Sequence, residues 1–300
     1  MPPRAKKTAS RRAPKRRKSG FRAGIAAAAL IALGLGAMHL QAKVVHVRSA
    51  EVVIDDLPEA FDGTRVLFAS DFDFTSSADA RQAERLFRKL QSLRPDLLLL
   101  GGDYASPSLL ERLNGSTGSE ETAARKTFFG ALEHFDAPLG KFAVSGDEDG
   151  PADALELSMF ESGVQLIDGE LALIEKDGAA IGVVGVGPQT RVSDLSGRIA
   201  GGRCVIALMH SPSRAVDVRI SEAGDGGEWA DLLLAGHTHG GQMKIGPATA
   251  LDLDTNEKRY LSGWFTDAAP LLVTQGVGCE GVKLRLGTEA EVWLLTLRGE

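Results

Sequence analysis

Carboxylate or imidazole side chains follow five apolar segments of this chain, each close to the point where the segment ends. Their positions in chain order are Asp71 with Asp73, Asp103, Asp147, His210, and His237 with His239. Carboxylate oxygens and imidazole nitrogens are the ligands with which proteins bind divalent metal ions. A single Gly-Asp after a strand is most often a turn, and a single histidine there is most often a polar cap. Five such groups in succession instead indicate a metal site.

The segments that precede these residues have the composition of buried strands, because they are nearly all apolar and show no polar alternation. The predicted strands cover residues 44–47, 52–54, 66–69, 97–100, 142–144, 171–174, 181–186, 205–209, 232–234, 271–273 and 292–297. Helical periodicity lies between them, over 79–93, 123–135 and 152–160. This alternation predicts a layered α/β domain with two sheets packed face to face and helices outside. Ligand sites in such sheets lie at the carboxyl ends of the strands, so the acids and histidines are expected to share one crevice.

In these positions the sequence resembles the calcineurin-like metallophosphoesterase superfamily. That family carries Asp-x-His, Gly-Asp, Gly-Asn-His-Asp/Glu, a lone His and Gly-His-x-His, each after a strand. The resemblance covers roughly residues 50–300 and is most specific at 236–242, Gly-His-Thr-His-Gly-Gly-Gln. It implies a four-layer αββα sandwich of two mixed sheets flanked by helices. Residues 271–297 are similar to the membrane-associated branch, which includes phosphodiesterases and UDP-diacylglucosamine pyrophosphatase-type enzymes.

The resemblance also implies two adjacent divalent metal ions bridged by Asp103. One ion is then held by Asp71, Asp73 and His239, and the other by Asp147, His210 and His237. Two such ions lower the pKa of a bound water and stabilise charge on phosphoryl oxygens, so a nucleophilic side chain is not needed. The implied activity is metal-dependent phosphoester hydrolysis, with catalytic roles for Glu148 and His210.

Two motifs differ from the family pattern. Asp73 stands where the first motif has a histidine, and Asp147-Glu148 stands where the third has Asn-His. The extra carboxylates neutralise the metal charge, which favours phosphodiesters over monoester dianions, and Mn²⁺ or Mg²⁺ over Zn²⁺ or Fe. Crowded carboxylates raise one another's pKa, so Glu148 is expected to donate a proton to the leaving group. The alternative is a catalytically degenerate binding protein at the membrane.

The N-terminus has the pattern of a single-pass membrane anchor. Residues 1–22 carry ten basic residues and no acid, and residues 23–40 are apolar apart from His39. Eighteen helical residues reach roughly 27 Å, enough for a thin bilayer core. The basic side is expected to stay in the cytoplasm, with the metallophosphoesterase domain, residues 43–300, outside. A cleaved signal peptide has the same charge pattern, and it remains the main alternative, ahead of a segment that is neither.

The charge balance limits the partners of the body. After the basic tail, 24 basic residues face 40 acidic ones, so no nucleic-acid partner is expected. Two cysteines, Cys204 and Cys279, are too few for a cysteine-rich zinc site. The expected partners are membrane lipid, through the N-terminal helix, and a phosphoester substrate that membrane tethering favours as lipid-linked or part of the cell envelope.

Overall fold

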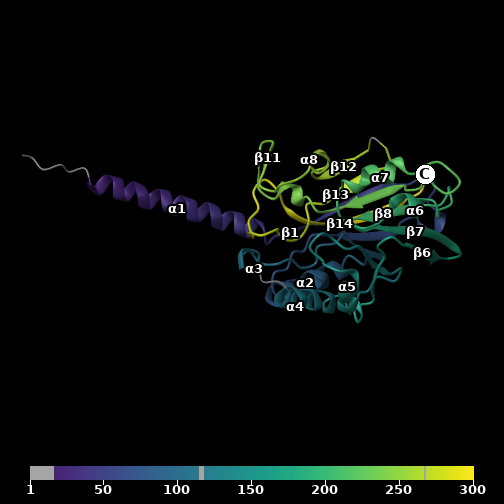
Figure 1. The fold of residues 1–300 in the computed structure, drawn as a ribbon, viewed down its shortest axis with the longest axis horizontal. Helices are drawn as coiled ribbons and strands as arrows, with labels where there is room; N and C mark the ends of the chain where they lie inside the picture. The colour runs from purple at the N-terminus through teal and green to yellow at the C-terminus, as the bar shows by residue number, and fades with distance from the viewer. Residues whose placement is uncertain (1–16, 115–117, 267) are drawn as a thin grey trace, which may run out of the picture.

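The structure, a computed structural model, describes residues 17–114, 118–266 and 268–300, and its body is built on two six-stranded sheets (Figure 1). The first sheet has the order β1-β14-β2-β3-β4-β5. Its strands are β1 Val45–Val53, β14 Ala290–Arg298, β2 Arg65–Ala69, β3 Leu97–Leu100, β4 Lys141–Ala143 and β5 Val164–Leu166. Strands β2 to β5 are parallel, whereas β14 is antiparallel to β2 and parallel to β1. The sheet is therefore mixed.

The second sheet has the order β12-β13-β9-β8-β7-β6 and is also mixed. Its strands are β12 Gly263–Phe265, β13 Leu271–Val273, β9 Leu232–Ala235, β8 Val205–Met209, β7 Ala179–Val186 and β6 Leu171–Lys176. The four central strands are parallel and the two outer strands are antiparallel to their neighbours. A small hairpin, β10 Lys244–Ile245 and β11 Ala248–Thr249, lies apart from both sheets.

Helices cover the outer face of each sheet. The first sheet carries α2 Ser77–Gln91, α4 Ser119–Gly130 and α5 Ala152–Met159, and the second carries α6 Val192–Ser196 and α7 Arg214–Ile220. The shorter helices are α3 Leu109–Asn114, α8 Thr255–Arg259, and the 3₁₀ turns η1 Glu59–Phe61 and η2 His239–Gly241. α2 begins where the Ser76 hydroxyl accepts the Asp79 N–H, and it buries residues 80, 83, 87 and 90 at helical spacing.

Three apolar clusters lie between the layers. The first joins α2, α4 and α5 to the first sheet, and it contains Phe87, Phe128 and Leu98. The second lies between the sheets, where Phe68 and Leu99 meet residues such as Ile206 of the second sheet. The third joins the second sheet to α6 and α7. The four-layer αββα sandwich predicted from the sequence is confirmed, because each sheet buries both faces.

The boundaries of some predicted elements differ from those observed. The two strands predicted at 44–47 and 52–54 are parts of one strand, β1, which pairs with β14 from Val45 to Val53 without a break. β1 is an edge strand, so Arg48 and Glu51 can reach solvent without interrupting it. Elements such as α6, α8 and β10 were not predicted because they are too short to show periodicity. The predicted surface loop 114–119 lies partly outside the described residues.

The first described element, α1 Arg17–Gln41, projects away from the body (Figure 1). Its portion Phe21–Gln41 is long and apolar enough to cross a membrane. The end of α1 contacts the C-terminal segment, because the backbone N–H of Arg285 donates to the Met38 carbonyl at 3.2 Å. The Gln41 amide donates to the carbonyl of Thr288 at 2.9 Å. The predicted basic tail lies largely outside the described residues.

Candidate metal centre

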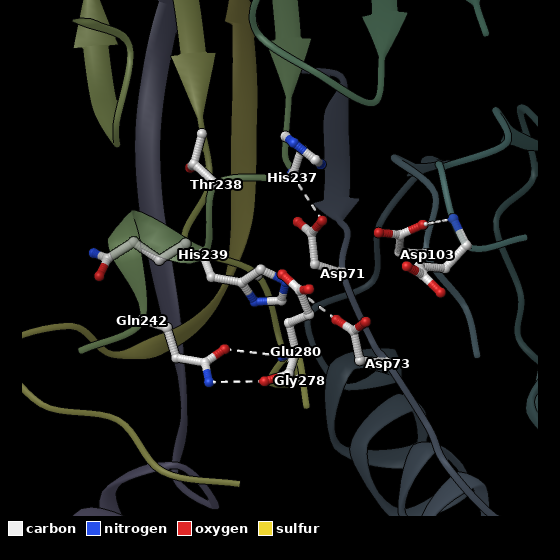
Figure 2. Close-up of polar contacts among 12 residues, drawn as sticks. Asp71, Asp73, Asp103, His237, Thr238, His239, Gln242, Gly278 and Glu280 are labelled. Carbon is white, nitrogen blue, oxygen red and sulfur yellow. Dashed lines mark hydrogen bonds and ion pairs between the residues drawn. The ribbon is translucent and has the colours of Figure 1, made fainter. Parts of the chain in front are cut away.

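The seven predicted ligand residues lie in loops at the carboxyl ends of strands of both sheets, and five of these residues are shown in Figure 2. Asp71 and Asp73 follow β2, Asp103 follows β3, Asp147 follows β4, His210 follows β8, and His237 and His239 follow β9. Backbone hydrogen bonds join two of these loops, since the N–H groups of Phe72 and Asp73 donate to the Asp103 carbonyl at 2.8 and 3.0 Å. The structure brings the predicted residues together as expected from the topology.

The backbone of this site is held in an uncommon conformation. Positive φ angles of 46° to 71° occur at five of the seven residues, Asp71, Asp73, Asp103, His237 and His239. Asp and His adopt this left-handed region more readily than most non-glycine residues, yet each instance costs on the order of 1–3 kcal/mol. Such conformations persist where the surrounding structure imposes them, and they are concentrated at functional sites. Here they turn successive side chains toward one centre.

One half of the site is formed by Asp103, His210 and His237. One possible ligand atom from each lies within 4.8 Å of the others. The His210 Nε2 atom is 3.2 Å from Asp103 Oδ2 and 3.1 Å from His237 Nδ1. Asp147 is more exposed and borders this group, with its Oδ2 atom 3.4 Å from His237 Nδ1. Three donor atoms of the types that bind divalent cations therefore converge, and Asp147 lies beside them.

The other half is formed by Asp71, Asp73 and His239 and is almost completely buried. His239 Nε2 is 3.2 Å from Asp73 Oδ2, and the Asp71 Oδ1 atom accepts the His237 backbone N–H at 2.7 Å (Figure 2). Asp71 Oδ2 and Asp73 Oδ1 are buried without a hydrogen-bond partner, whereas Asp73 Oδ2 faces His239. Buried carboxylate oxygens without compensation are strongly unfavourable. A bound cation would compensate them, so this donor set fits a divalent metal ion.

Hydrogen bonds outside the centre orient two of the histidines. His210 donates from Nδ1 to the Gly101 carbonyl at 2.8 Å, which leaves the Nε2 lone pair facing Asp103. His237 Nε2 lies 3.1 Å from the Glu257 carboxylate, which leaves Nδ1 facing the centre. A ligating histidine commonly donates its second N–H to a carbonyl or carboxylate in this way. In both rings, one nitrogen is therefore held by a partner outside the centre while the other faces the centre.

The electrostatics of the site favour cations. Burial raises the pKa of the Asp71 carboxyl above its usual value. Burial disfavours the charged form of His210, but the Asp103 carboxylate outweighs burial and holds the pKa of His210 well above its usual value. Asp73 has the same effect on the pKa of His239. At both histidines, the neighbouring carboxylates thus favour positive charge at a buried position.

Glu148 lies at the rim of the centre rather than inside it. Its backbone N–H donates to Asp103 Oδ1 at 3.0 Å, and its carboxylate lies 3.1 Å from the Arg112 guanidinium. Burial raises the pKa of the Glu148 carboxyl, and Arg112 opposes that shift. Sequence reasoning did not identify Arg112, because a lone arginine in a short helix carries no motif. It places a positive charge beside the carboxylates.

Two further acids that support the site were also missed. Asp149 is fully buried and accepts the backbone N–H groups of Asp103, Tyr104 and Gly146 at 2.8 to 2.9 Å. Glu257 belongs to α8, where it forms a capping box with Asp254 in addition to its contact with His237. Asp149 was visible in the third motif as the residue after Glu148. Glu257 offered only a capping pattern, which does not indicate a partner distant in sequence.

Glu257→Gln is expected to weaken Mn²⁺ binding by about 10- to 100-fold, the usual range for loss of a partner that orients a metal ligand. The amide keeps the shape of Glu257 but lowers the basicity of His237 and does not fix its tautomer. Isothermal titration of Mn²⁺ into the full-length protein measures this effect. Glu111→Gln is a matched control, because Glu111 forms a similar reciprocal cap with Ser108 on α3. Equal Mn²⁺ affinity in both variants would contradict the orienting role.

Comparison with known proteins gives several relatives over most of the chain, although no family model matches. The chain is 26% identical over 284 residues to an uncharacterized metallophosphoesterase of Aquifex aeolicus, covering 90% of this chain and 98% of that protein. It is 26% identical over 221 residues to phosphodiesterase YaeI of Escherichia coli, covering 68% and 71% of the two chains. A transmembrane protein with metallophosphoesterase domain from Danio rerio is 24% identical over 271 residues, covering 85% of this chain and 57% of that protein.

Full-length similarity to the Aquifex protein, taken with the layered fold and the ligand loops at its strand ends, defines the class as metal-dependent hydrolases of ester bonds. Members of this class use divalent metal ions, which the carboxylate and imidazole donors of the site suit. Within that class, the metallophosphoesterase names of the relatives and the two-sheet fold support the superfamily that the sequence resembles.

Proposed function

We propose that this protein hydrolyses phosphodiesters by means of two adjacent divalent metal ions bridged by Asp103. The observation that carries this proposal is the position of Asp103 between the two halves of the site. Its carboxylate lies 3.2 Å from His210 Nε2, while the loop that contains it is hydrogen-bonded to the loop of Asp71 and Asp73. The buried, uncompensated oxygens of Asp71 and Asp73 support a second ion beside the first.

The residues would divide between the ions as follows: Asp71, Asp73 and His239 at one, Asp147, His210 and His237 at the other, and Asp103 at both. When bound, such ions supply an activated water and stabilise charge on the phosphoryl oxygens. Gly101 and Glu257 hold the two histidine rings in their ligating orientation. Mn²⁺ or Mg²⁺ suits this carboxylate-rich set better than Zn²⁺.

Glu148 and Arg112 are proposed to act on the substrate at the rim. Burial raises the pKa of Glu148, which suits a group that donates a proton to the leaving alcohol. Arg112, 3.1 Å from that carboxylate, can bind an anionic phosphoryl oxygen when Glu148 is protonated. The histidine that the family carries at position 148 is thereby replaced by a carboxyl group and an adjacent guanidinium.

Two hollows that border different residues of the centre support the preference for diesters. One of about 790 Å³ borders Asp147 and includes Thr190 and Arg191, and one of about 580 Å³ borders Asp73. A phosphodiester has two substituents, and each would have a hollow to occupy. The negative charge of the carboxylates also favours diesters. It weakens the Coulombic attraction of the site for a monoester dianion more than for a diester monoanion.

The test of this function compares the hydrolysis of bis(p-nitrophenyl) phosphate and p-nitrophenyl phosphate by the full-length protein in nanodiscs with Mn²⁺. We expect kcat/KM to be at least about tenfold higher for the diester, a difference of about 1.4 kcal/mol. Loss of turnover in His237→Ala excludes a contaminating enzyme. Higher activity on the monoester would contradict the diester preference. Metal binding without turnover, with Mn²⁺, Mg²⁺, Fe²⁺ or Zn²⁺, would favour the alternative of a catalytically degenerate binding protein.

We also propose that α1 is a retained anchor with the N-terminus in the cytoplasm and the body outside. The ten basic residues before residue 23 support this orientation, and the contacts of Met38 and Gln41 with the body support retention. Cleavage near residue 42 would remove those contacts.

Protease added to spheroplasts that express the protein is expected to digest the body and leave a fragment of tail and α1 in the membrane. Immunoblotting for tags at both termini measures this result, and an intact cytoplasmic marker shows that the spheroplasts were sealed. A body digested only after lysis would reverse the orientation. An N-terminal tag absent from the mature protein would indicate a cleaved signal peptide.

A further inference from the structure

The hollow of about 580 Å³ beside Asp73, called the groove below, is lined both by this residue of the metal centre and by residues at the end of α1. This volume is within the range of about 300–1,000 Å³ that is usual for small-molecule sites. The lining includes Val45 and Val47 of β1, Leu86 of α2, and Leu93 just after α2. The lining also includes Asp73 of the metal centre, and His39 and Lys43, at and just beyond the end of α1.

Strand register explains why the groove joins these two features. β1 begins a few residues after α1, and its Val45 pairs with Ala290 at the start of β14. β14 runs antiparallel to β2, with Trp293 opposite Phe68. Extending that register by three residues brings Asp71 to the level of Ala290 and Val45. The metal centre therefore lies at the same edge of the sheet as the end of α1, where the helix meets the body in Figure 1.

The chemistry of the groove suits an anionic amphiphile. Its lining is mainly apolar residues, and it also includes the cations Lys43, Arg85 and Lys89. A fourth cation, Lys283, forms an ion pair with Asp79 at the same groove. Asp73, the remaining acid of the lining, belongs to the metal centre. A ligand with a hydrocarbon chain and a negatively charged phosphate would match both parts of this lining.

We propose that the groove binds the hydrocarbon chain of a membrane lipid whose phosphodiester group lies at the metal centre. This inference rests on the proposed function and names its substrate class. The span Phe21–Gln41 ends immediately before Ala42 and Lys43, so a lipid could enter from the interface without leaving the membrane. In the reaction, a water oxygen forms a new bond to phosphorus and the bond from phosphorus to the leaving oxygen breaks. The leaving oxygen takes up a proton, which gives a phosphomonoester and an alcohol.

The first test uses Val47→Glu and Val53→Glu, a matched pair on β1. An even spacing places both side chains on the same face of the strand, and they are 45% and 56% exposed, but only Val47 lines the groove. The full-length protein in phosphatidylcholine nanodiscs is assayed with hexadecyl and methyl p-nitrophenyl phosphate. We expect the hexadecyl-to-methyl ratio of kcat/KM to fall at least about tenfold in Val47→Glu and to stay at the wild-type value in Val53→Glu. Any long-chain ester concentrates in the lipid and can raise this ratio without binding in the groove. The test therefore compares the ratio between the two variants and does not rely on the wild type alone.

A second measurement does not need turnover. Hexadecyl phosphate with a diazirine near the end of its chain is photolysed in the same nanodiscs, and labelled peptides are identified by mass spectrometry. Label on residues 82–93 of the wild type, at least about tenfold weaker in Val47→Glu, supports the groove even if no ester is hydrolysed. Label in the groove without hydrolysis would contradict the proposed hydrolase function but not the binding of a hydrocarbon chain in the groove.

Two results would overturn the inference while leaving the hydrolase function intact. One is an unchanged chain-length ratio in Val47→Glu with normal turnover. The other is label confined to residues 21–41, which would show that the hydrocarbon chain contacts the helix in the bilayer but does not enter the groove. The groove would then be left for a different occupant, such as a polypeptide.

Discussion

Asp103→Asn is expected to lower kcat/KM for bis(p-nitrophenyl) phosphate by at least about 10²–10³-fold, the loss typical when one group that stabilises the transition-state charge is removed. Asparagine preserves the shape of Asp103, and its Oδ1 atom can still accept the hydrogen bond from the Glu148 N–H. It removes the negative charge that faces His210 and that we propose is shared by two ions. Metal content measured by mass spectrometry should therefore fall together with turnover.

Asp231→Asn is the control for this variant. The Asp231 carboxylate is half-buried, and it accepts the Val205 N–H at 2.7 Å at the start of β8, the end of the strand opposite the metal centre. An amide oxygen can accept the same hydrogen bond, so metal content and turnover should stay near those of the wild type. Normal metal content in Asp103→Asn would show that Asp103 does not bridge two ions.

Gly236→Ala is expected to destabilise the fold by about 1–3 kcal/mol, the usual cost of overpacking, and to abolish most of the metal-dependent turnover. A methyl group on Gly236 would overlap the Ser70 hydroxyl and the Asp71 carboxylate. Ser70 and Asp71 follow β2, in the other sheet, so relief of the overlap must separate the loops that carry the ligands. Thermal unfolding by circular dichroism and Mn²⁺ titration measure the two effects.

Gly130→Ala provides the comparison, because Gly130 ends α4 and a methyl group there has no atom within 4 Å. Its stability and Mn²⁺ affinity should match the wild type or improve slightly, since alanine favours helix. If Gly236→Ala kept both properties as well, the two sheets would not need to approach so closely at the site.

Much of the fold followed from local patterns. The buried strands 66–69, 97–100, 205–209 and 232–234 were predicted within about one residue of β2, β3, β8 and β9, because continuous apolar runs bounded by glycine or acid occur mainly in covered sheets. The convergence of the seven acids and histidines followed from the same strands, since ligands gather at carboxyl ends. Their assignment to two metal ions came from the family resemblance, and it stays a prediction.

The chain sequence by itself therefore determined the layered architecture, the residue types of the site and the apolar N-terminal segment, since each is written in local periodicity or in short spacings. Only the tertiary structure decided that Glu257 holds His237, that Arg112 lies beside Glu148, and that a groove joins Asp73 to the end of α1. These relations link residues far apart in the chain. They depend on strand order and register, which place β1 next to β14 and β14 next to β2. Local periodicity specifies which face of an element is buried but not which element covers it, so contacts of this kind become visible only when the sheets are assembled.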